Sequence, residues 1–124
     1  MQYGEKTVLV VEDDSVVAEL IQQTLISHHY QVLLAHDGLE AMQQTNYHHV
    51  DLIVMDTRQP YFSGFWFCQA FRRKKNTRNI PIVLVSAVVD DENDRKARLA
   101  GAASTVKRSF TSEELLEVVE KNSL

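Results

Sequence analysis

Short runs of apolar residues recur along the chain, and each is followed by a turn and a stretch with helical spacing. The runs are rich in Val, Ile and Leu, which is typical of strands buried on both faces of a sheet. Apolar residues three and four positions apart fill the stretches between them, as in amphipathic helices. The expected strands are residues 6–11, 31–35, 52–55, 80–85 and 104–107. The expected helices are residues 16–25, 39–49, 65–75, 90–100 and 111–119.

The alternation of five strands with five helices indicates the fold class. Strands joined through helices by short connections lie parallel in one sheet, with helices packed on both faces. A chain of 124 residues is long enough for one domain with a sizeable core, and no linker or internal repeat divides it. We therefore predict a single domain over residues 1–124, an α/β fold with a doubly wound, five-stranded parallel sheet.

The composition excludes some classes of partner and indicates a cellular compartment. The net charge of −4 argues against nucleic acid as a direct partner. One cysteine cannot form an internal disulfide, which fits a reducing compartment. The N-terminus lacks the features of a signal peptide, and no apolar stretch approaches the roughly 18–20 residues that span a bilayer. We expect a cytoplasmic protein without membrane contact.

Carboxylates stand directly after two of the expected strands. Glu12, Asp13 and Asp14 follow the first strand, and Asp56 ends the third. The carboxyl ends of parallel strands share one edge, where open α/β sheets bind ligands. Two unit charges about 5 Å apart repel by roughly 3 kcal/mol at an effective dielectric of 20, so such a cluster favours a bound cation. Mg²⁺ is the best fit, because it prefers carboxylates, waters and phosphate oxygens. Capping of the next helix by Asp14 or Ser15 explains at most one of these acids.

A hydroxyl and a cation complete the polar set. Ser86 follows the fourth strand, and either Lys107 or Arg108 follows the fifth. Together with an aspartate they provide the groups for phosphoryl transfer to a carboxylate nucleophile. The first strand–helix junction contains no glycine, which argues against a dinucleotide site. Asp56 is the first candidate for the nucleophile.

With these residues in view, the chain resembles the receiver domain of two-component response regulators over residues 6–122. The resemblance rests on Val10 to Asp14, Asp56 followed by Pro60 and Gly64, Val85 to Ala87, Gly101-Ala102, and Phe110. It implies the flavodoxin-like (βα)5 receiver fold and a regulatory, phospho-accepting domain rather than an enzyme. It also implies a histidine kinase or phosphotransfer protein as phosphodonor, and a downstream protein target.

The resemblance assigns roles to individual residues. Asp56 is implied to be the phospho-acceptor, and Ser86 to hydrogen-bond the phosphoryl group. For Mg²⁺, the implied ligands are Asp13 and Asp56 directly, Glu12 through water, and the backbone carbonyl of Arg58. These roles carry over position by position and remain expectations.

Departures from the family pattern motivate an alternative. The family's Lys-Pro before the aromatic is Arg108-Ser109 here, and the planar arginine is not equivalent to an ammonium group. Without the proline, the family's cis peptide is in doubt. Thr105 stands where an aromatic switch is usual, and Gln59 replaces a usual methionine. The alternative is a pseudo-receiver, an interaction module without phosphoryl turnover. A Mg²⁺-dependent phosphatase ranks low, because Arg58 stands where its general acid is needed.

Aromatic residues are concentrated after Asp56. Phe67 and Phe71, four positions apart, are expected in the core, as is Cys68. Trp66 lies off that face. Single exposed apolar residues are common, and an anchor for a partner protein is the alternative role. The basic run at 72–75 fits a solvated helix end, with a patch for an acidic partner as the alternative. The five histidines are expected at the surface, without a metal-binding role.

Overall fold

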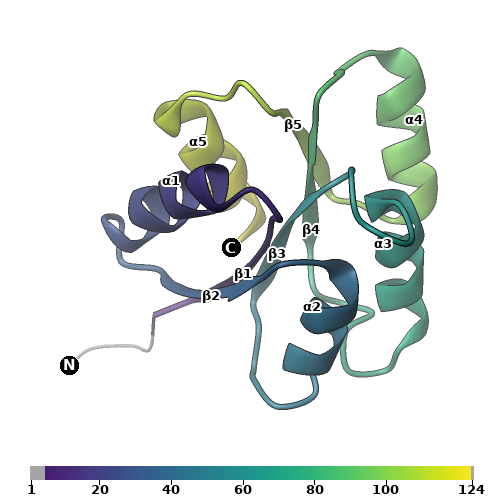
Figure 1. Ribbon diagram of the computed structural model, residues 1–124, viewed down its shortest axis with the longest axis horizontal. Helices are drawn as coiled ribbons and strands as arrows, with labels where there is room; N and C mark the ends of the chain where they lie inside the picture. Colours follow the sequence, from purple (N-terminus) through teal and green to yellow (C-terminus); the bar gives the residue numbers. More distant parts are fainter. Residues whose placement is uncertain (1–4, 124) are drawn as a thin grey trace.

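The computed structural model describes residues 5–123 and contains one five-stranded parallel sheet with helices on both sides (Figure 1). The strands are β1 (Thr7–Val11), β2 (Gln31–Ala35), β3 (Leu52–Asp56), β4 (Ile82–Ser86) and β5 (Ser104–Lys107). The helices are α1 (Ser15–Ile26), α2 (Gly38–Gln44), α3 (Gly64–Arg73), α4 (Asp91–Ala100) and α5 (Ser112–Asn122). The strand order β2-β1-β3-β4-β5 is that of flavodoxin-like sheets, so the predicted fold class is confirmed.

Two separate hydrophobic clusters hold the helices against the sheet. Figure 1 shows α1 and α5 on one face and α2, α3 and α4 on the other. The cluster under α2, α3 and α4 includes Leu9, Met55, Phe67, Phe71 and Ala97. The cluster under α1 and α5 includes Val8, Val54, Ile21, Leu25 and Leu115. Adjacent strand residues thus face opposite clusters, as the pleat requires, and every residue of β3 is buried.

Side-chain caps begin the helices close to the predicted positions. Ser63 accepts a hydrogen bond from the backbone N–H of Trp66 at 3.2 Å and caps α3. Thr111 and Glu114 form a reciprocal capping box at the start of α5, as their spacing predicted. Asp14 caps α1 through the N–H of Val16 at 2.9 Å. The cap fixes where the chain turns from the carboxyl end of β1 into α1.

The second helix is shorter than predicted. The sequence suggested a helix over residues 39–49, whereas α2 ends at Gln44. The Thr45 hydroxyl donates to the Met42 carbonyl at 2.8 Å, and the Asn76 side chain donates to the Thr45 carbonyl at 3.2 Å. These bonds occupy carbonyls at the helix end. The early end leaves residues 46–49 to form the turn that brings the buried Val50 to the start of β3.

Gly38, at the start of α2, is the contact point between α2 and α3. A Cβ atom at this position would lie 2.4 Å from ring carbons of Phe67, which is fully buried. We expect Gly38→Ala to lower the free energy of unfolding by about 1–3 kcal/mol, because the core cannot accept the extra methyl group. A Gly→Ala change in an open helical position has the opposite sign.

Urea denaturation followed by circular dichroism measures this change. Gln43→Ala, at an exposed position of α2, is the matched control and should stay within about 0.5 kcal/mol of the wild type. A Gly38→Ala protein as stable as the control would show that the Phe67 ring shifts without cost.

Candidate functional site

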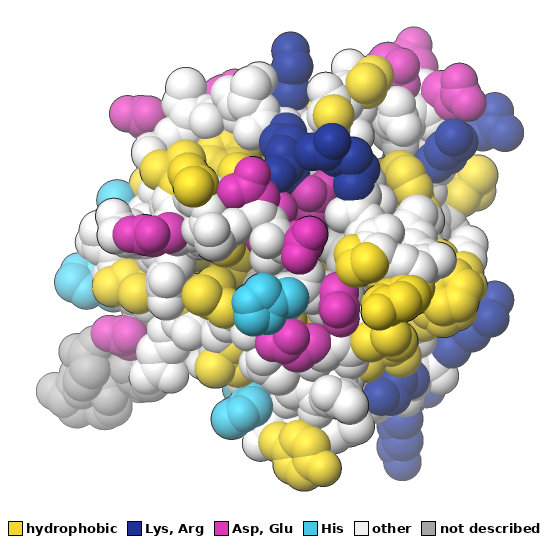
Figure 2. Space-filling view, in the orientation of Figure 1, with side chains coloured by type: hydrophobic (Ala, Val, Ile, Leu, Met, Phe, Trp, Pro, Cys, Tyr) yellow, Lys and Arg dark blue, Asp and Glu magenta, His cyan; other side chains and the backbone are white. Residues whose placement is uncertain are grey.

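The carboxyl ends of β1, β3 and β5 border a polar cleft of about 590 Å³. Figure 2 shows Asp and Glu side chains directly beside a group of Lys and Arg side chains at this end of the sheet. The cleft lies where the strand order reverses between β1 and β3, the usual place for a ligand in this type of sheet. Its lining residues are Glu12, Asp13, Asp14, Asp56, Arg58, Gln59, Pro60 and Arg108.

Asp56 is the last residue of β3, and only 4% of its surface is exposed. One carboxylate oxygen, Oδ1, accepts a hydrogen bond from the backbone N–H of Arg58 at 2.9 Å. The other, Oδ2, accepts one from the guanidinium of Arg108. Gly64 allows the following loop to close tightly on this residue, since a Cβ there would lie 2.5 Å from the Asp56 carbonyl oxygen. The carboxylate is therefore held in one orientation at the floor of the cleft.

Glu12 faces the same guanidinium from the end of β1. Its two oxygens accept hydrogen bonds from Arg108 Nη1 at 3.0 Å and Nη2 at 3.2 Å, a bidentate pair. Burial raises the pKa of Glu12 above its ordinary value, and the hydrogen bond from Arg108 opposes this shift. The hydrogen bond to Glu12 in turn raises the pKa of Arg108. Arg108 thus supplies the positive charge that two buried carboxylates require.

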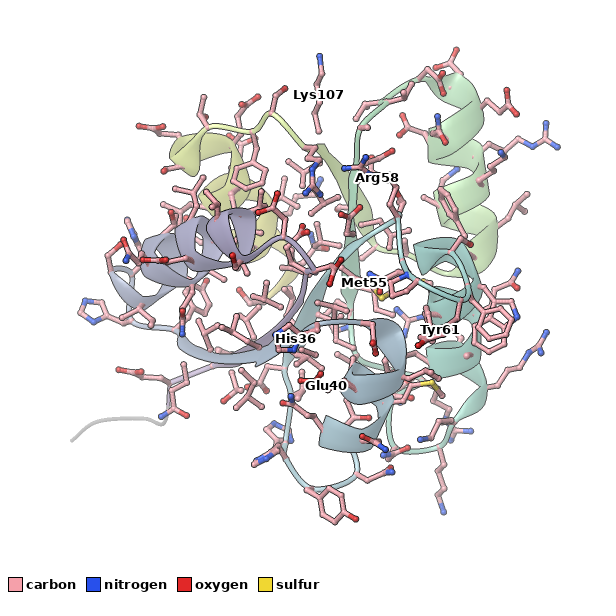
Figure 3. All side chains as sticks on the ribbon, in the orientation of Figure 1. His36, Glu40, Met55, Arg58, Tyr61 and Lys107 are labelled. Atoms are coloured by element: carbon pink, nitrogen blue, oxygen red, sulfur yellow. The ribbon has the colours of Figure 1, made fainter. Side chains whose placement is uncertain are left out.

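The geometry distinguishes between the two candidate cations at the end of β5. Lys107 is exposed and extends away from the molecule, as Figure 3 shows. The Arg108 side chain lies on the other side of the backbone, inside the cleft. The backbone N–H of Arg108 donates to the Ser86 carbonyl at 2.8 Å. Successive residues of a strand point to opposite sides, so only one of these two neighbours can face the cleft. No peptide bond among residues 5–123 is cis, including the one between Arg108 and Ser109.

Asp13 and Arg58 lie at the rim of the cleft. Both side chains are exposed, and Figure 3 shows Arg58 above the end of β3. The oxygen donors that suit Mg²⁺ are present, because Glu12, Asp13 and Asp56 border one space. Arg108 nevertheless stands between Glu12 and Asp56. In the part of the chain that the structure describes, no three acidic, histidine or cysteine side chains are arranged as a preformed metal site.

Ser86 and Thr105 are each held by a hydrogen bond that the sequence did not predict. The buried Ser86 hydroxyl donates to the Val88 carbonyl at 2.7 Å, within the loop that follows β4. It must rotate to reach a group on Asp56. The Thr105 hydroxyl donates to an oxygen of Asp94 at 3.0 Å and so links β5 to α4. This hydrogen bond is made at the position where the family usually carries an aromatic side chain.

Gln59 is a positioning residue that sequence analysis treated as a minor change. Its side-chain amide donates to the Asp56 carbonyl at 2.9 Å, and its side-chain oxygen accepts from the N–H of Gly38 at 3.0 Å. It therefore links the end of β3 to the start of α2. The two residues it joins are far apart in the sequence, so no local pattern signals this role.

The remaining candidates fit the expected structural roles. All five histidines are exposed. His49 contacts Asp51 at 2.8 Å, and His36 contacts Glu40 at 3.1 Å. Cys68 is fully buried, and burial raises the pKa of its thiol to about 11, so it is an inert core residue. None of the helices within residues 5–123 is long and apolar enough to cross a membrane.

Comparison with known proteins shows the family to which the chain belongs. The response regulator receiver domain family matches residues 8–120, so the chain belongs to that family. Members of this family are regulatory domains that are phosphorylated by histidine kinases and act on downstream targets. A relative, the uncharacterized transcriptional regulatory protein YrkP of Bacillus subtilis, is 34% identical over 87% of this chain. The chain spans only 45% of that relative's length.

Solved receiver structures have the same fold. The chemotaxis response regulator CheY4 of Vibrio cholerae superimposes with a TM-score of 0.90 at 26% identity, covering 94% of this chain and 98% of that one. The receiver domain of the sensor histidine kinase PA1611 from Pseudomonas aeruginosa gives 0.86 at 27% identity, covering 95% and 97%. That crystal structure has a magnesium ion coordinated in its active site cleft.

The pairing of Arg108 with Glu12 and Asp56 leads to a pH-dependent prediction. Arg108→Ala leaves both buried carboxylates without a cation, and we expect a loss of about 3–5 kcal/mol in the free energy of unfolding at pH 7. Without the guanidinium, burial and the charge of Asp56 raise the pKa of Glu12 further above 4.5. A raised folded-state pKa makes stability fall as pH rises from the unfolded value through the folded value. The loss should therefore shrink toward pH 4.5.

Urea denaturation at a series of pH values measures this dependence. Lys107→Ala removes the neighbouring exposed cation and should change stability little at any pH. A loss in Arg108→Ala that is the same at pH 4.5 and pH 7 would mean that the unpaired carboxylates do not cause it.

Proposed function

We propose that this chain is a response regulator receiver that accepts a phosphoryl group on Asp56 in a Mg²⁺-dependent phosphorelay and signals through protein contacts. The main support is the position of Asp56. Its buried carboxylate is held at the floor of the cleft by the Arg58 N–H and the Arg108 guanidinium. The chain's membership of the receiver family supports the same chemistry. The phosphodonor would be a histidine kinase or phosphotransfer protein.

The reaction forms one bond and breaks another. An Asp56 oxygen forms a P–O bond while the P–N bond to the donor's imidazole breaks, and the imidazole nitrogen keeps the electron pair. The negative charge of the transferring group spreads over its three equatorial oxygens. Oδ2 must leave the Arg108 guanidinium before it attacks, and Arg108 can then pair with a phosphoryl oxygen. Ser86 can supply a further hydrogen bond after it rotates away from Val88.

Mg²⁺ has a defined set of candidate ligands. Asp13, Asp56 and the Arg58 carbonyl would hold it directly, and Glu12 would hold it through water. When bound, the ion neutralises charge on the carboxylates and the phosphoryl oxygens. The magnesium in the cleft of the Pseudomonas receiver supports this assignment. Arg108 uses oxygens from the same set, so Arg108 and the metal ion compete for them.

A second candidate function follows from the partners that Arg108 and Ser86 already have. Arg108 already neutralises Glu12 and Asp56, and the Ser86 hydroxyl is already bonded to Val88. A cleft that is satisfied in this way could serve as the rigid base of an interaction module without phosphoryl turnover. The two functions make opposite predictions about the chemistry of Asp56.

The first test is direct phosphorylation. Acetyl phosphate with Mg²⁺ should add one phosphoryl group to the wild-type protein and none to Asp56→Asn, as read by intact-mass spectrometry. Asp51→Asn is the matched control, because it removes a carboxylate at the opposite end of β3 and should still be labelled. A wild-type protein that stays unmodified, beside a receiver that is labelled in parallel, would favour the interaction module.

The second test concerns the competition between Arg108 and Mg²⁺. Arg108→Lys exchanges a bidentate fork for a single point charge, which removes about one charge-assisted hydrogen bond from Glu12. We expect this variant to bind Mg²⁺ about tenfold more tightly than the wild type, which corresponds to roughly 1.4 kcal/mol. Asp13→Ala should bind it more weakly.

Isothermal titration and Mg²⁺-dependent thermal stabilisation both report these affinities without phosphate. Lys107→Arg adds a guanidinium outside the cleft and should leave the affinity unchanged. Equal Mg²⁺ binding in the wild type and Asp13→Ala would remove Asp13 from the ligand set. An Arg108→Lys variant that binds no more tightly would contradict the competition.

A further inference from the structure

A group of large hydrophobic side chains is exposed on the loop after β3 and on α3 and α4. We call Tyr61, Phe62, Trp66 and Leu99 the aromatic surface, and their exposed fractions are 78%, 44%, 43% and 71%. Figure 2 shows hydrophobic side chains gathered on this side of the molecule, and Figure 3 shows Tyr61 projecting from it. Single exposed apolar residues are common, but contiguous groups of them mark interaction sites.

Two rings of the aromatic surface are held rigidly. Phe62 stacks on Trp66 with ring centroids 4.1 Å apart and planes 15° from parallel. Both rings meet the edge or face of the buried Phe67, at 6.1 and 5.1 Å. Because Phe67 is fixed in the core, the two outer rings have little conformational freedom to lose when a partner binds. Preorganised aromatic residues of this kind dominate the energy of protein interfaces.

A groove between α3 and α4 continues the aromatic surface. It has a volume of about 380 Å³, and its walls include Phe65, Trp66, Gln69, Lys96, Leu99 and Ala100. Trp66 forms one wall and Leu99 the other, so an apolar side chain entering the groove would contact both. A groove of this shape between two helices suits the apolar face of a third helix.

The charge in the lining of the groove is positive. Lys96 is part of its wall, and none of the residues that line it is acidic. Arg73 lies on the same helical stripe as Trp66 and Gln69, is exposed, and has no carboxylate within 4.0 Å among residues 5–123. Lys96 pairs only with the exposed Glu92, at 3.7 Å. The chain as a whole carries a net charge of −4, so this positive region is local.

We propose that the aromatic surface and the adjoining groove bind an acidic amphipathic helix of a partner protein. Its apolar residues would occupy the groove between Trp66 and Leu99, and its carboxylates would pair with Lys96 and Arg73. A second copy of this chain is a poorer occupant. A symmetric contact would bring Lys96 and Arg73 of one copy close to Lys96 and Arg73 of the other, and like charges repel. The proposal goes beyond phosphoryl transfer, and the binding does not require a modified Asp56.

Trp66 is the only tryptophan in the chain, so its fluorescence reports this surface alone. The probe is a synthetic helical peptide of about 18 residues, five turns, with leucine at successive i, i+4 and i+7 positions and glutamate on the flanks. A twin peptide carries lysine in place of every glutamate. In the unphosphorylated protein, the acidic peptide should shift the Trp66 emission to the blue saturably and bind at least about tenfold more tightly than the twin.

Matched variants locate the binding. Leu99→Ser should weaken the binding of the acidic peptide about tenfold. Leu20→Ser makes the same change on α1, where Leu20 is 50% exposed on the opposite face of the sheet, and should have no effect. The double variant Arg73→Glu and Lys96→Glu should reverse the preference between the two peptides. Trp66 stays intact in all of them and remains the reporter.

Several outcomes would overturn the proposal. The first is an acidic peptide that gives no saturable shift of the Trp66 emission. The second is equal affinity for the acidic and the lysine peptide. The third is an equal loss of affinity in Leu99→Ser and Leu20→Ser. A blue shift that grows with protein concentration alone, together with a dimer in sedimentation velocity, would assign the surface to a second copy. Failure of Asp56 to accept phosphate would not bear on any of these measurements, so the two proposals can fail separately.

Discussion

The site depends on one electrostatic constraint, the need of two buried carboxylates for a cation. Glu12 directly follows β1, Asp56 is the last residue of β3, and each is only 4% exposed. Arg108 meets both from the end of β5, although β4 lies between β5 and β3 in the sheet. A long, forked side chain spans that distance and satisfies three carboxylate oxygens at once. One residue thereby fixes the relative positions of three strand ends.

The same constraint connects structure to function. A site that binds a metal ion needs carboxylates that are close together and able to change partners. Arginine holds them more firmly than lysine, because it bonds Glu12 through two nitrogens. Removing one partner of such a buried pair is costly, because it leaves an unpaired charge. In the function we propose, the same pairing would oppose a metal ion that uses these oxygens.

The sequence predicted those features that depend on local pattern. The five strands, the helix caps at Ser63 and Thr111, and the burial of Phe67 and Phe71 all follow from periodicity and capping residues. Strand ends also predicted that Glu12 and Asp56 would meet, because parallel strands share one edge. Contacts between distant segments were not predictable. They include the Gln59 bridge to Gly38, the Thr105–Asp94 bond and the Asn76–Thr45 bond at the end of α2.

The loop between Asp56 and α3 is the segment best placed to connect the cleft with the aromatic surface. The loop contributes Gln59 and Pro60 to the lining of the cleft, and Tyr61 and Phe62 to the aromatic surface. Tyr61 has φ = 73°, a left-handed conformation that costs roughly 1–2 kcal/mol outside glycine and persists only where surrounding contacts enforce it. The backbone N–H of Phe62 donates to the Pro60 carbonyl at 2.9 Å and closes a tight turn around Tyr61. Gln59 bonds the Asp56 carbonyl at the start of this loop. In the function we propose, a phosphoryl group on Asp56 would alter the aromatic surface through the loop only if it binds two states of the loop with different free energies.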